Sequence, residues 1–228
     1  MFELSAAFAR IKEDVNTCKE RDPAARSTLE VLLLYPGLHA IWEYRIAHKF
    51  YEKDLHFAAR ALSQHAAKTT GIEIHPAAQI GRRFFIDHGH GVVIGETTII
   101  GDDVIVYQGV TLGGTGKETG KRHPTLGNNV MVGSGAKVLG PLTIGDNVKV
   151  ASGAVVLDDI PEGSTAVGVP AKVVRQYGER VETLDQIHIP DPVTTQLDNL
   201  QKQVTSLRLA LEALKKGRGD EGEETVNL

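Results

Sequence analysis

The chain has 228 residues, of which 41% are hydrophobic and 24% are charged, as in a folded protein with a substantial core. Its formal net charge of −4 gives no reason to expect nucleic acid binding, and its longest apolar run, residues 31–35, is far shorter than the about 20 residues that span a bilayer. Because the single cysteine, Cys18, cannot form an internal disulfide, we expect a cytoplasmic protein that binds neither nucleic acid nor membrane.

Residues 1–70 carry the patterns of several helices and are predicted to form an all-helical domain. Ser27 and Glu30 fit a capping box, in which the hydroxyl accepts from backbone amides at a helix start while the carboxylate reaches back. Residues 38–53 and the alanine-rich residues 55–69 form two further helical runs. Near the beginning of the chain, apolar residues follow the spacing of one helical face at Leu4, Phe8, Ile11 and Val15.

From residue 71 onward an aliphatic residue returns every six positions, a period that neither a helix nor an alternating strand produces. The series slips by two positions between Val92 and Ile94 and then resumes. Its members are Ile74, Ile80, Ile86, Val92, Ile94, Ile100, Val106, Leu112, Leu126, Val132, Val138, Ile144, Val150 and Val156. This pattern predicts a parallel β-helix over residues 71–170, in which three six-residue units close one triangular coil.

Residues 113–125 interrupt the six-residue series and are predicted to leave the coil as a loop. A coil can eject such a loop without disturbing its neighbours, and loops on rigid scaffolds often carry functional groups. One coil earlier, Asp87 and His88 occupy positions that such strands usually fill with small or neutral side chains. We therefore expect Asp87, His88, Arg122 and His123 to project near one another.

Taken together, these motifs resemble the serine O-acetyltransferase family. The similar segments are GIEIHPAAQIG, FFIDHGHGVVIGE, GVTLGGTGK, KRHPTLG, GSGAKVLG and GVPAKVV, together with ERDPAA at 20–25, and they cover roughly residues 15–175. The resemblance implies an α+β fold with N-terminal helices and a left-handed parallel β-helix. It also implies acetyl transfer from acetyl-CoA to the hydroxyl of L-serine, without a metal, as the first step of cysteine biosynthesis. L-Cysteine is the implied feedback inhibitor at the serine site.

The general base of such a reaction is assigned to His88. An alcohol is a poor nucleophile unless its proton is removed as it attacks, and an unperturbed imidazole titrates near pH 6.5, close to the working pH. The family orients this base with an aspartate two residues before the histidine of its IHP sequence, and this chain has Glu73 at that position. Glu73 precedes His88 by less than one coil of about 18 residues, so we expect the two side chains to meet on adjacent layers.

The substrate carries both an ammonium and a carboxylate, so its site needs acidic groups and a guanidinium. Asp22 and Asp87 match the family's amine-binding acids, and Arg122 matches its carboxylate ligand. His123 matches a second histidine that positions the substrate. For Asp22 a structural role is equally open, because Asp-Pro is a common beginning of a helix.

The pantetheine arm of acetyl-CoA is expected to lie against exposed backbone amides of the β-helix. The matching positions are Gly114, Ser134 and Ser152, whose small side chains allow a close approach. Lys172 and Arg175 are weaker candidates for contacts with the CoA phosphates, because exposed basic residues are usually only solvated. We expect direct attack within a ternary complex and no covalent intermediate.

The residues leave three alternatives open. One is a hexapeptide acetyltransferase that acts on a sugar or antibiotic hydroxyl, although Asp22, Asp87 and Arg122 favour an amino acid. Another is a zinc hydrase of the γ-carbonic anhydrase kind with histidine ligands, although His88 and His90 stand closer together than the ligands of those enzymes. A third is a non-catalytic trimeric spacer, because fold does not dictate function.

The C-terminal region is predicted to comprise a connector (171–192), a coiled-coil helix (193–216) and a flexible acidic tail (217–228). Apolar residues of the helix follow the spacing of a coiled-coil seam at Val193, Leu197, Leu200, Val204, Leu207, Leu211 and Leu214. We expect a homotrimer held in part by this helix. No second trimer is expected to join it, since only about twenty residues precede Asp22, whereas longer family members extend their helical domain there.

A possible protein partner is O-acetylserine sulfhydrylase. In the family the C-terminal tail docks into the active site of that enzyme, and its last residue is isoleucine. This chain ends in Leu228, which branches at a different carbon. We therefore expect weak or absent binding to the sulfhydrylase.

Overall fold

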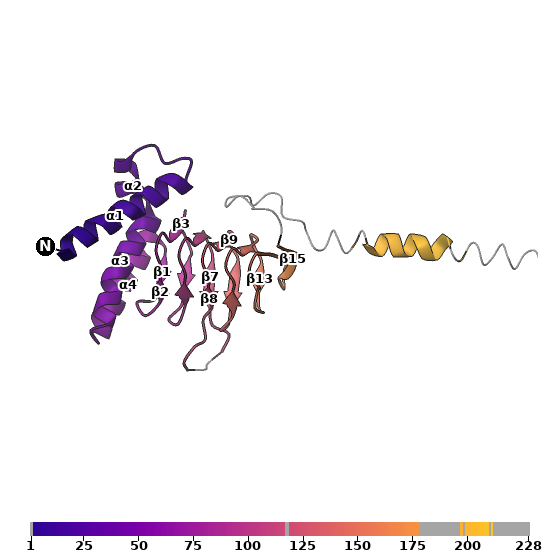
Figure 1. Cartoon of the computed structure of the whole chain (residues 1–228). Coiled ribbons are helices and arrows are strands. Elements are labelled where there is room, and N and C mark those ends of the chain that lie inside the picture. The colour runs from indigo at the N-terminus through magenta and orange to yellow at the C-terminus, as the bar shows by residue number, and fades with distance from the viewer. Residues whose placement is uncertain (1, 117–118, 178–196, 198, 210, 212–228) are drawn as a thin grey trace, which may run out of the picture. The chain divides into compact units, whose positions relative to one another are not determined.

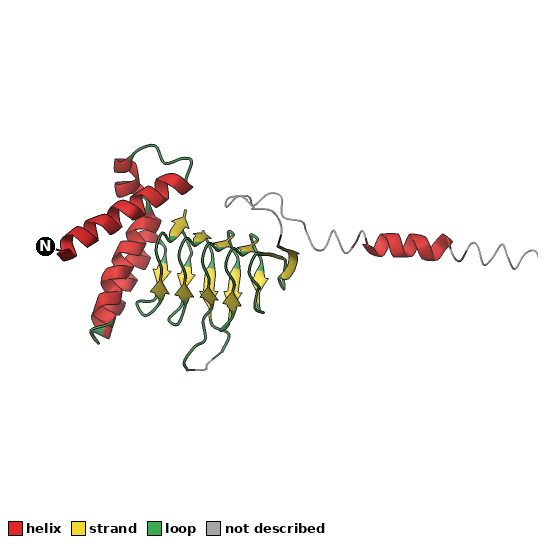
Figure 2. Ribbon diagram, in the orientation of Figure 1, coloured by secondary structure: helices red, strands yellow, loops and turns green. Residues whose placement is uncertain are grey.

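The computed structural model describes the chain over residues 2–116, 119–177, 197, 199–209 and 211. Internal contacts define one unit over residues 1–189 and a second unit over residues 190–228. In the first unit, four helices are followed by a stack of short strands (Figure 1, Figure 2). Among the described residues, no helix has both the length and the apolar character needed to cross a membrane.

The helices begin and end where the sequence supplies caps. Their bounds are α1 (Phe2–Arg21), α2 (Thr28–Leu34), α3 (Pro36–Tyr51) and α4 (His56–Thr70). At the start of α2 the Ser27 hydroxyl accepts the amide hydrogen of Glu30 at 3.1 Å, and the Glu30 carboxylate accepts the amide hydrogen of Arg26 at 3.2 Å. The capping box therefore forms with its return bond one residue further back than predicted. Helix α4 ends at Gly71, whose φ of 74° suits glycine.

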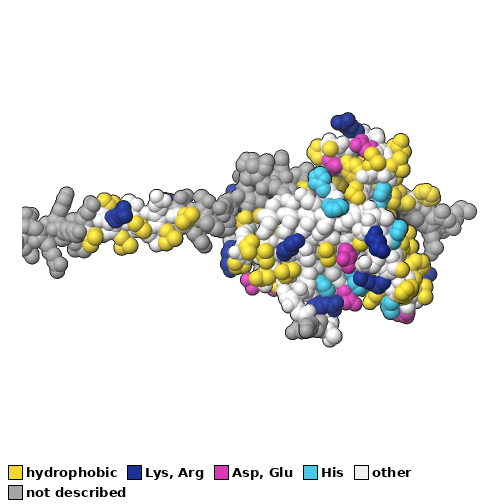
Figure 3. All heavy atoms as spheres, turned by 180° about the vertical axis from the view of Figure 1, so that it is seen from behind, with side chains coloured by type: hydrophobic (Ala, Val, Ile, Leu, Met, Phe, Trp, Pro, Cys, Tyr) yellow, Lys and Arg dark blue, Asp and Glu magenta, His cyan; other side chains and the backbone are white. Residues whose placement is uncertain are grey.

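Only part of the apolar stripe predicted for α1 is buried. Val15 is 5% exposed, whereas Phe8 is 66% exposed and Ile11 is 37% exposed; the side chain of Leu4 lies outside the described part. Figure 3 shows that apolar side chains also gather elsewhere over the surface of the helices. The second half of α1 packs against the strands in a buried cluster of Val15, Cys18, Val31, Leu38, Phe85, Ile105, Tyr107 and Met131.

The remainder of the first unit is a parallel β-solenoid of about five turns, as predicted. One sheet contains β1 (Glu73–Ile74), β4 (Val93–Ile94), β7 (Thr111–Gly113), β10 (Lys137–Leu139) and β13 (Val155–Val156). A second sheet contains β2 (Gln79–Ile80), β5 (Ile99–Ile100), β8 (Thr125–Leu126) and β11 (Thr143–Ile144). The third contains β3 (Phe85–Asp87), β6 (Ile105–Tyr107), β9 (Met131–Val132), β12 (Lys149–Val150) and β14 (Ser164–Val167), and β15 (Lys172–Gln176) pairs antiparallel to β14. The handedness of the coil stays a prediction.

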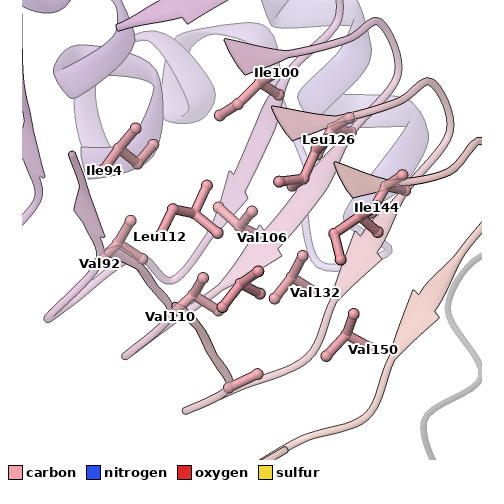
Figure 4. Close-up of a cluster of buried hydrophobic side chains, with 14 of the residues drawn as sticks. Val92, Ile94, Ile100, Val106, Val110, Leu112, Leu126, Val132, Ile144 and Val150 are labelled. Atoms are coloured by element: carbon pink, nitrogen blue, oxygen red, sulfur yellow. The ribbon is translucent and has the colours of Figure 1, made fainter. Parts of the chain in front are cut away.

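The six-residue series forms the core of this solenoid. Its members point into the prism and stack from coil to coil, as Figure 4 shows for the labelled members from Val92 to Val150; Val110, which is also labelled, is a buried neighbour outside the series. Most are at most 4% exposed, and Ile80 is partly buried against the same core. The predicted loop leaves the coil between β7 and β8, and its residues 117–118 lie outside the described part.

Helix α3 approaches the coil very closely at Gly37. A Cβ atom at Gly37, near the start of α3, would overlap the carbonyl oxygen of Ile86. Glycine at this position therefore lets α3 lie directly on β3. This contact places the helical segment next to the end of β3, where Asp87 and His88 lie.

In the second unit, the described residues 197, 199–209 and 211 are helical. Five apolar residues of the predicted seam are exposed there, namely Leu197, Leu200, Val204, Leu207 and Leu211. Leu209 is also exposed, at 63%, but it lies off the seam. Val193, Leu214, the connector beyond residue 177 and the tail with Leu228 lie outside the described residues.

Candidate active site

The corner that follows β3 is two residues longer than the corner stacked on it. Strand pairing aligns Asp87 with Tyr107. In the second coil one residue then precedes the left-handed Gly109, whereas in the first coil three residues, 88–90, precede the left-handed Gly91. These two glycines stack on each other. The two-position slip of the six-residue series therefore marks a bulge in the coil.

His88 occupies this bulge. Its φ of 57° lies in the left-handed region, and the amide of Gly89 donates to the carbonyl oxygen of Asp87 at 2.7 Å, which closes a tight turn around His88. The His88 side chain is exposed, whereas Asp87 is half-buried. An accessible imidazole beside a carboxylate is suited to remove a proton from a bound alcohol.

Asp22 lies near Asp87, although 65 positions separate them in the sequence. Burial raises the pKa of Asp87, the neighbouring His88 lowers it, and the negative charge of Asp22 raises it further. The next helix takes Ser27 as its N-cap, so the proposed helix-capping role of Asp22 is not observed. Two carboxylates that lie near each other form a site suited to an ammonium group.

The Asp22 carboxylate is held on both oxygens. Its Oδ1 accepts the amide hydrogen of Ala24 at 2.7 Å, and its Oδ2 accepts the hydroxyl hydrogen of Tyr35 at 2.6 Å. Tyr35 lies between α2 and α3. It was not identified from the sequence, because a tyrosine after an apolar helix is more typical of core packing than of a functional site. Its contact with Asp22 depends on how α1 and α3 cross.

Glu73 lies on β1 and faces Arg60 of α4. Its Oε1 is 3.8 Å from the Arg60 Nη2, and both side chains are partly exposed. Within the described residues, Glu73 and His88 are not hydrogen-bonded to each other. The predicted pairing of Glu73 with the base therefore stays a prediction.

The end of the loop that returns to the coil is tied to Thr97, three residues after the end of β4. The Thr97 hydroxyl oxygen accepts the amide hydrogens of Arg122 and His123, each at 3.0 Å. The Arg122 guanidinium donates to the Glu96 carboxylate at 2.6 Å. Glu96 and Thr97 belong to the IGETT run of residues 94–98, whose three polar residues shortly after a buried strand were a usable signal. They fix the direction of Arg122.

The same contacts set the protonation of His123. The Thr97 amide donates to the His123 Nδ1 at 3.2 Å, and the Thr97 hydroxyl lies 3.0 Å from that atom. Nδ1 is therefore an acceptor, and a neutral ring carries its hydrogen on Nε2. Burial lowers the pKa of His123, and the charge of Arg122 lowers it further. His123 is thus a neutral hydrogen-bond donor at neutral pH, and its ring packs over Gly95, where a Cβ would overlap it.

The expected site residues form two groups in one chain. Asp22, Asp87 and His88 lie at the corner before β4, whereas Arg122 and His123 lie beside the residues that follow β4. Residues 89–94, which end in β4, lie between His88 at one corner and Gly95 at the next. Among the described residues, no hydrogen bond or ion pair joins the two groups within one chain, and their predicted proximity stays a prediction.

The positions expected to bind CoA divide in the same way. Ser134 and Ser152 stack in register along the corner edge that begins at Asp87, and the Ser134 hydroxyl donates to the Ser152 hydroxyl at 3.1 Å. Gly114 lies at the other edge, where a Cβ would approach the Arg122 carbonyl oxygen to 3.1 Å. Lys172 and Arg175 are exposed on β15. These two edges of the prism thus each carry part of the expected serine site and part of the expected acetyl-CoA site.

Comparisons with known proteins fit this arrangement. Residues 123–158 match the family model described as bacterial transferase hexapeptide, six repeats. The solenoid, the loop and this match define the chain as a hexapeptide-repeat transferase.

More specific relatives are serine acetyltransferases. The enzyme of Staphylococcus xylosus is 56% identical over 200 residues, which are 87% of this chain and 93% of that protein. A serine acetyltransferase solved in complex with cysteine superposes with a TM-score of 0.78 at 40% identity, over 81% of this chain and 73% of that one. The enzyme of Brucella abortus, solved with coenzyme A, gives a TM-score of 0.74 at 38% identity over 78% and 72% of the two chains. The chain belongs to the serine acetyltransferase family.

Proposed function

We propose that the chain transfers the acetyl group of acetyl-CoA to the hydroxyl of L-serine, the step that begins cysteine biosynthesis. The observation that carries the proposal is the bulged corner, which presents His88 beside the carboxylates of Asp87 and Asp22. Family membership favours this reaction over acetylation of a sugar or antibiotic, over a zinc hydrase and over a non-catalytic spacer.

In the proposed reaction His88 removes the proton of the serine hydroxyl while the oxygen attacks the thioester carbonyl carbon. The new C–O bond forms, the C–S bond breaks, and the CoA sulfur leaves with the proton that His88 had taken. The ammonium of serine lies between Asp22 and Asp87, and its carboxylate is bound by Arg122 with His123 as a neutral donor. The step needs no metal ion, and Glu73 orients His88 when the site is complete.

The site becomes complete between two copies of the chain. Asp22, Asp87 and His88 come from one copy, and Arg122 and His123 come from the loop edge of its neighbour. A closed ring of three copies repeats this head-to-tail contact three times, which supports a homotrimer. Acetyl-CoA lies along the same interface, between the edge with Ser134 and Ser152 and the edge with Gly114.

The proposed inhibitor is L-cysteine, bound where L-serine binds. It carries the same ammonium and carboxylate as serine, and a related enzyme has been solved with cysteine. The sulfhydrylase remains a proposed weak partner through the C-terminal tail. The cytoplasm remains the proposed location, in keeping with a single cysteine, Cys18, whose thiol is buried.

The trimer is proposed to be extended by the C-terminal helices. The exposed side chains Leu197, Leu200 and Val204 continue at coiled-coil spacing, and the apolar side chains of this helix are open to solvent in Figure 3. A lone helix gains nothing from such a seam, whereas three copies bury it.

The function is tested by thiol release from acetyl-CoA with L-serine as acceptor. His88→Ala is expected to lower kcat by about 10²–10⁴-fold, since a positioned base contributes that much, while calorimetry shows unchanged acetyl-CoA binding. His88→Asn, a polar side chain that tolerates the left-handed φ of this position but cannot act as a base, serves as the control for structure and is expected to be equally inactive. A His88→Ala enzyme that keeps more than a tenth of wild-type kcat would overturn the assignment of the base.

A further inference from the structure

Tyr35 is anchored so that only its hydroxyl reaches the candidate site. It is the residue before the first turn of α3, and its ring packs against the buried cluster that joins the helices to the third sheet. The hydroxyl donates to the Asp22 Oδ2 at 2.6 Å, within the short range typical of an O–H donor facing a carboxylate. The ring therefore holds the donor in place, and the donor holds the carboxylate.

The bond fixes the orientation of Asp22. With Ala24 donating to Oδ1 and Tyr35 donating to Oδ2, the carboxylate cannot rotate about its Cβ–Cγ bond without losing both hydrogen bonds. Each oxygen keeps a free lone-pair direction for one more donor. Asp22 lies close enough to Asp87 for its negative charge to raise the pKa of Asp87, so the two carboxylates are near enough to act on one ammonium group.

The hydroxyl also stays a donor throughout the pH range of an assay. Burial, the hydrogen bond to Asp22 and the negative charge of Asp22 all raise the pKa of Tyr35 above its ordinary value. Within the described part of the chain, the Tyr35 hydroxyl donates to Asp22 and to no other acceptor. Its effect on Asp22 is therefore constant with pH.

We propose that Tyr35 is a positioning residue for recognition of the substrate ammonium: it orients the Asp22 carboxylate, and Asp22 with Asp87 then binds the amine. The inference deepens the proposed function and rests on it. It assigns to the turn between α2 and α3 a part in selecting acceptors that carry a protonated amine next to the reacting alcohol.

The first test compares Tyr35→Phe with the wild-type enzyme. Loss of one hydrogen bond to a charged group is expected to raise KM for L-serine about tenfold, while KM for acetyl-CoA stays within about twofold. Tyr177→Phe is the matched control, because the Tyr177 hydroxyl also donates to a carboxylate, that of Glu162, at 3.2 Å. Tyr177 lies just after β15, at the end of the third sheet opposite to β3, and its variant is expected to leave KM for L-serine unchanged.

The second test separates positioning from structure. 3-Hydroxypropanoate has the alcohol and the carboxylate of serine but no amine, so the preference for L-serine over it is expected to fall about tenfold in Tyr35→Phe. In an Asp22→Asn background, Tyr35→Phe is expected to add no further loss. An unchanged KM for L-serine, an equal rise of both KM values, or additive losses in the double variant would each overturn the assignment.

Calorimetric binding of L-serine to wild type and Tyr35→Phe gives the same comparison without turnover. About tenfold weaker binding to the variant supports the assignment, and equal binding contradicts it. If wild type binds L-serine but releases no thiol from acetyl-CoA, the proposed chemistry fails while this comparison still decides the part of Tyr35. The two failures are therefore distinguishable.

Discussion

At the scale of single residues, Asp87 combines a functional charge with a structural cost. Its pKa is raised mainly by burial, so the folded chain holds the carboxyl proton more tightly than the unfolded chain does. The ionised form therefore lowers the free energy of unfolding at pH values above the folded-state pKa. This cost disappears below the unfolded pKa of about 3.9.

Asp87→Asn is accordingly expected to stabilise the fold and to impair substrate binding. At pH 7 the melting temperature is expected to rise by about 2 °C, and KM for L-serine by about tenfold or more. The gain in melting temperature is expected to vanish by about pH 4, where wild-type Asp87 also becomes protonated. Calorimetric scans at the two pH values check this, and a gain that is the same at both would contradict the burial argument.

Gly95 is a second residue whose identity is set by the site. A Cβ at Gly95 would overlap the His123 ring, which must then move and break its hydrogen bonds with Thr97. Gly95→Ala is expected to raise KM for L-serine about tenfold, with little change in kcat, because only substrate positioning is lost. The measurement is repeated in a His123→Ala background, where Gly95→Ala is expected to cause no further rise of KM for L-serine. A further loss in that background would show that Gly95 acts on the backbone instead.

At the scale of elements, the six-residue series specifies which side chains fill the prism. Leu112 is fully buried, whereas Leu157 is 48% exposed at a neighbouring corner. Leu112→Ala is expected to cost about 2–5 kcal/mol in free energy of unfolding, and Leu157→Ala less than about 1 kcal/mol. Chemical denaturation of the two variants checks the register. Equal costs would mean that the inward side of the coil has been assigned incorrectly.

The solenoid was predictable because its signal is local and repeated. Each inward residue, such as Ile100 or Val132, is identified by its neighbours six positions away, and the short helices were identified by Ser27 and Gly71. The contacts of Thr97 with Arg122 and His123 were not predictable, since they join a strand end to a loop about 25 residues further on. Nothing in the local sequence specifies where such a loop returns.

The bulge at His88 lies between these two cases. Its signal was present as the slip between Val92 and Ile94, but a shift in period does not say on which side the extra residues leave the coil. The apolar stripe of α1 shows the opposite error, because Phe8 and Ile11 have helical spacing and yet remain exposed in the single chain. Periodicity identifies a face of an element but not the partner of that face.

At the scale of the whole molecule, the C-terminal seam is expected to contribute to assembly. Leu200→Asp and Val204→Asp place charges in the seam, whereas Ser206→Asp places the same charge on an outer position of the same helix. In light scattering, the two seam variants are expected to dissociate at a protein concentration about tenfold or more higher than the wild-type trimer does. Ser206→Asp is expected to dissociate at the wild-type concentration. If all three variants dissociate at the same concentration, the C-terminal seam does not stabilise the trimer. A wild-type hexamer would contradict the predicted trimer.

The two separated halves of the site lead to the central claim, that catalysis takes place between copies of the chain. If His88 and Arg122 act from different copies, a His88→Ala chain and an Arg122→Ala chain carry defects that need not fall in the same site. Each mixed trimer then contains one interface in which both residues are intact.

The most direct measurement is the thiol-release activity of these two inactive variants after they are unfolded and refolded together in equal amounts. With random assembly about a quarter of all sites are expected to be intact, so about a quarter of wild-type kcat should return. Each variant refolded alone serves as the control and is expected to stay inactive. Activity in the mixture no higher than in these controls, with mixed trimers demonstrated by mass spectrometry, would contradict the claim that the site is shared.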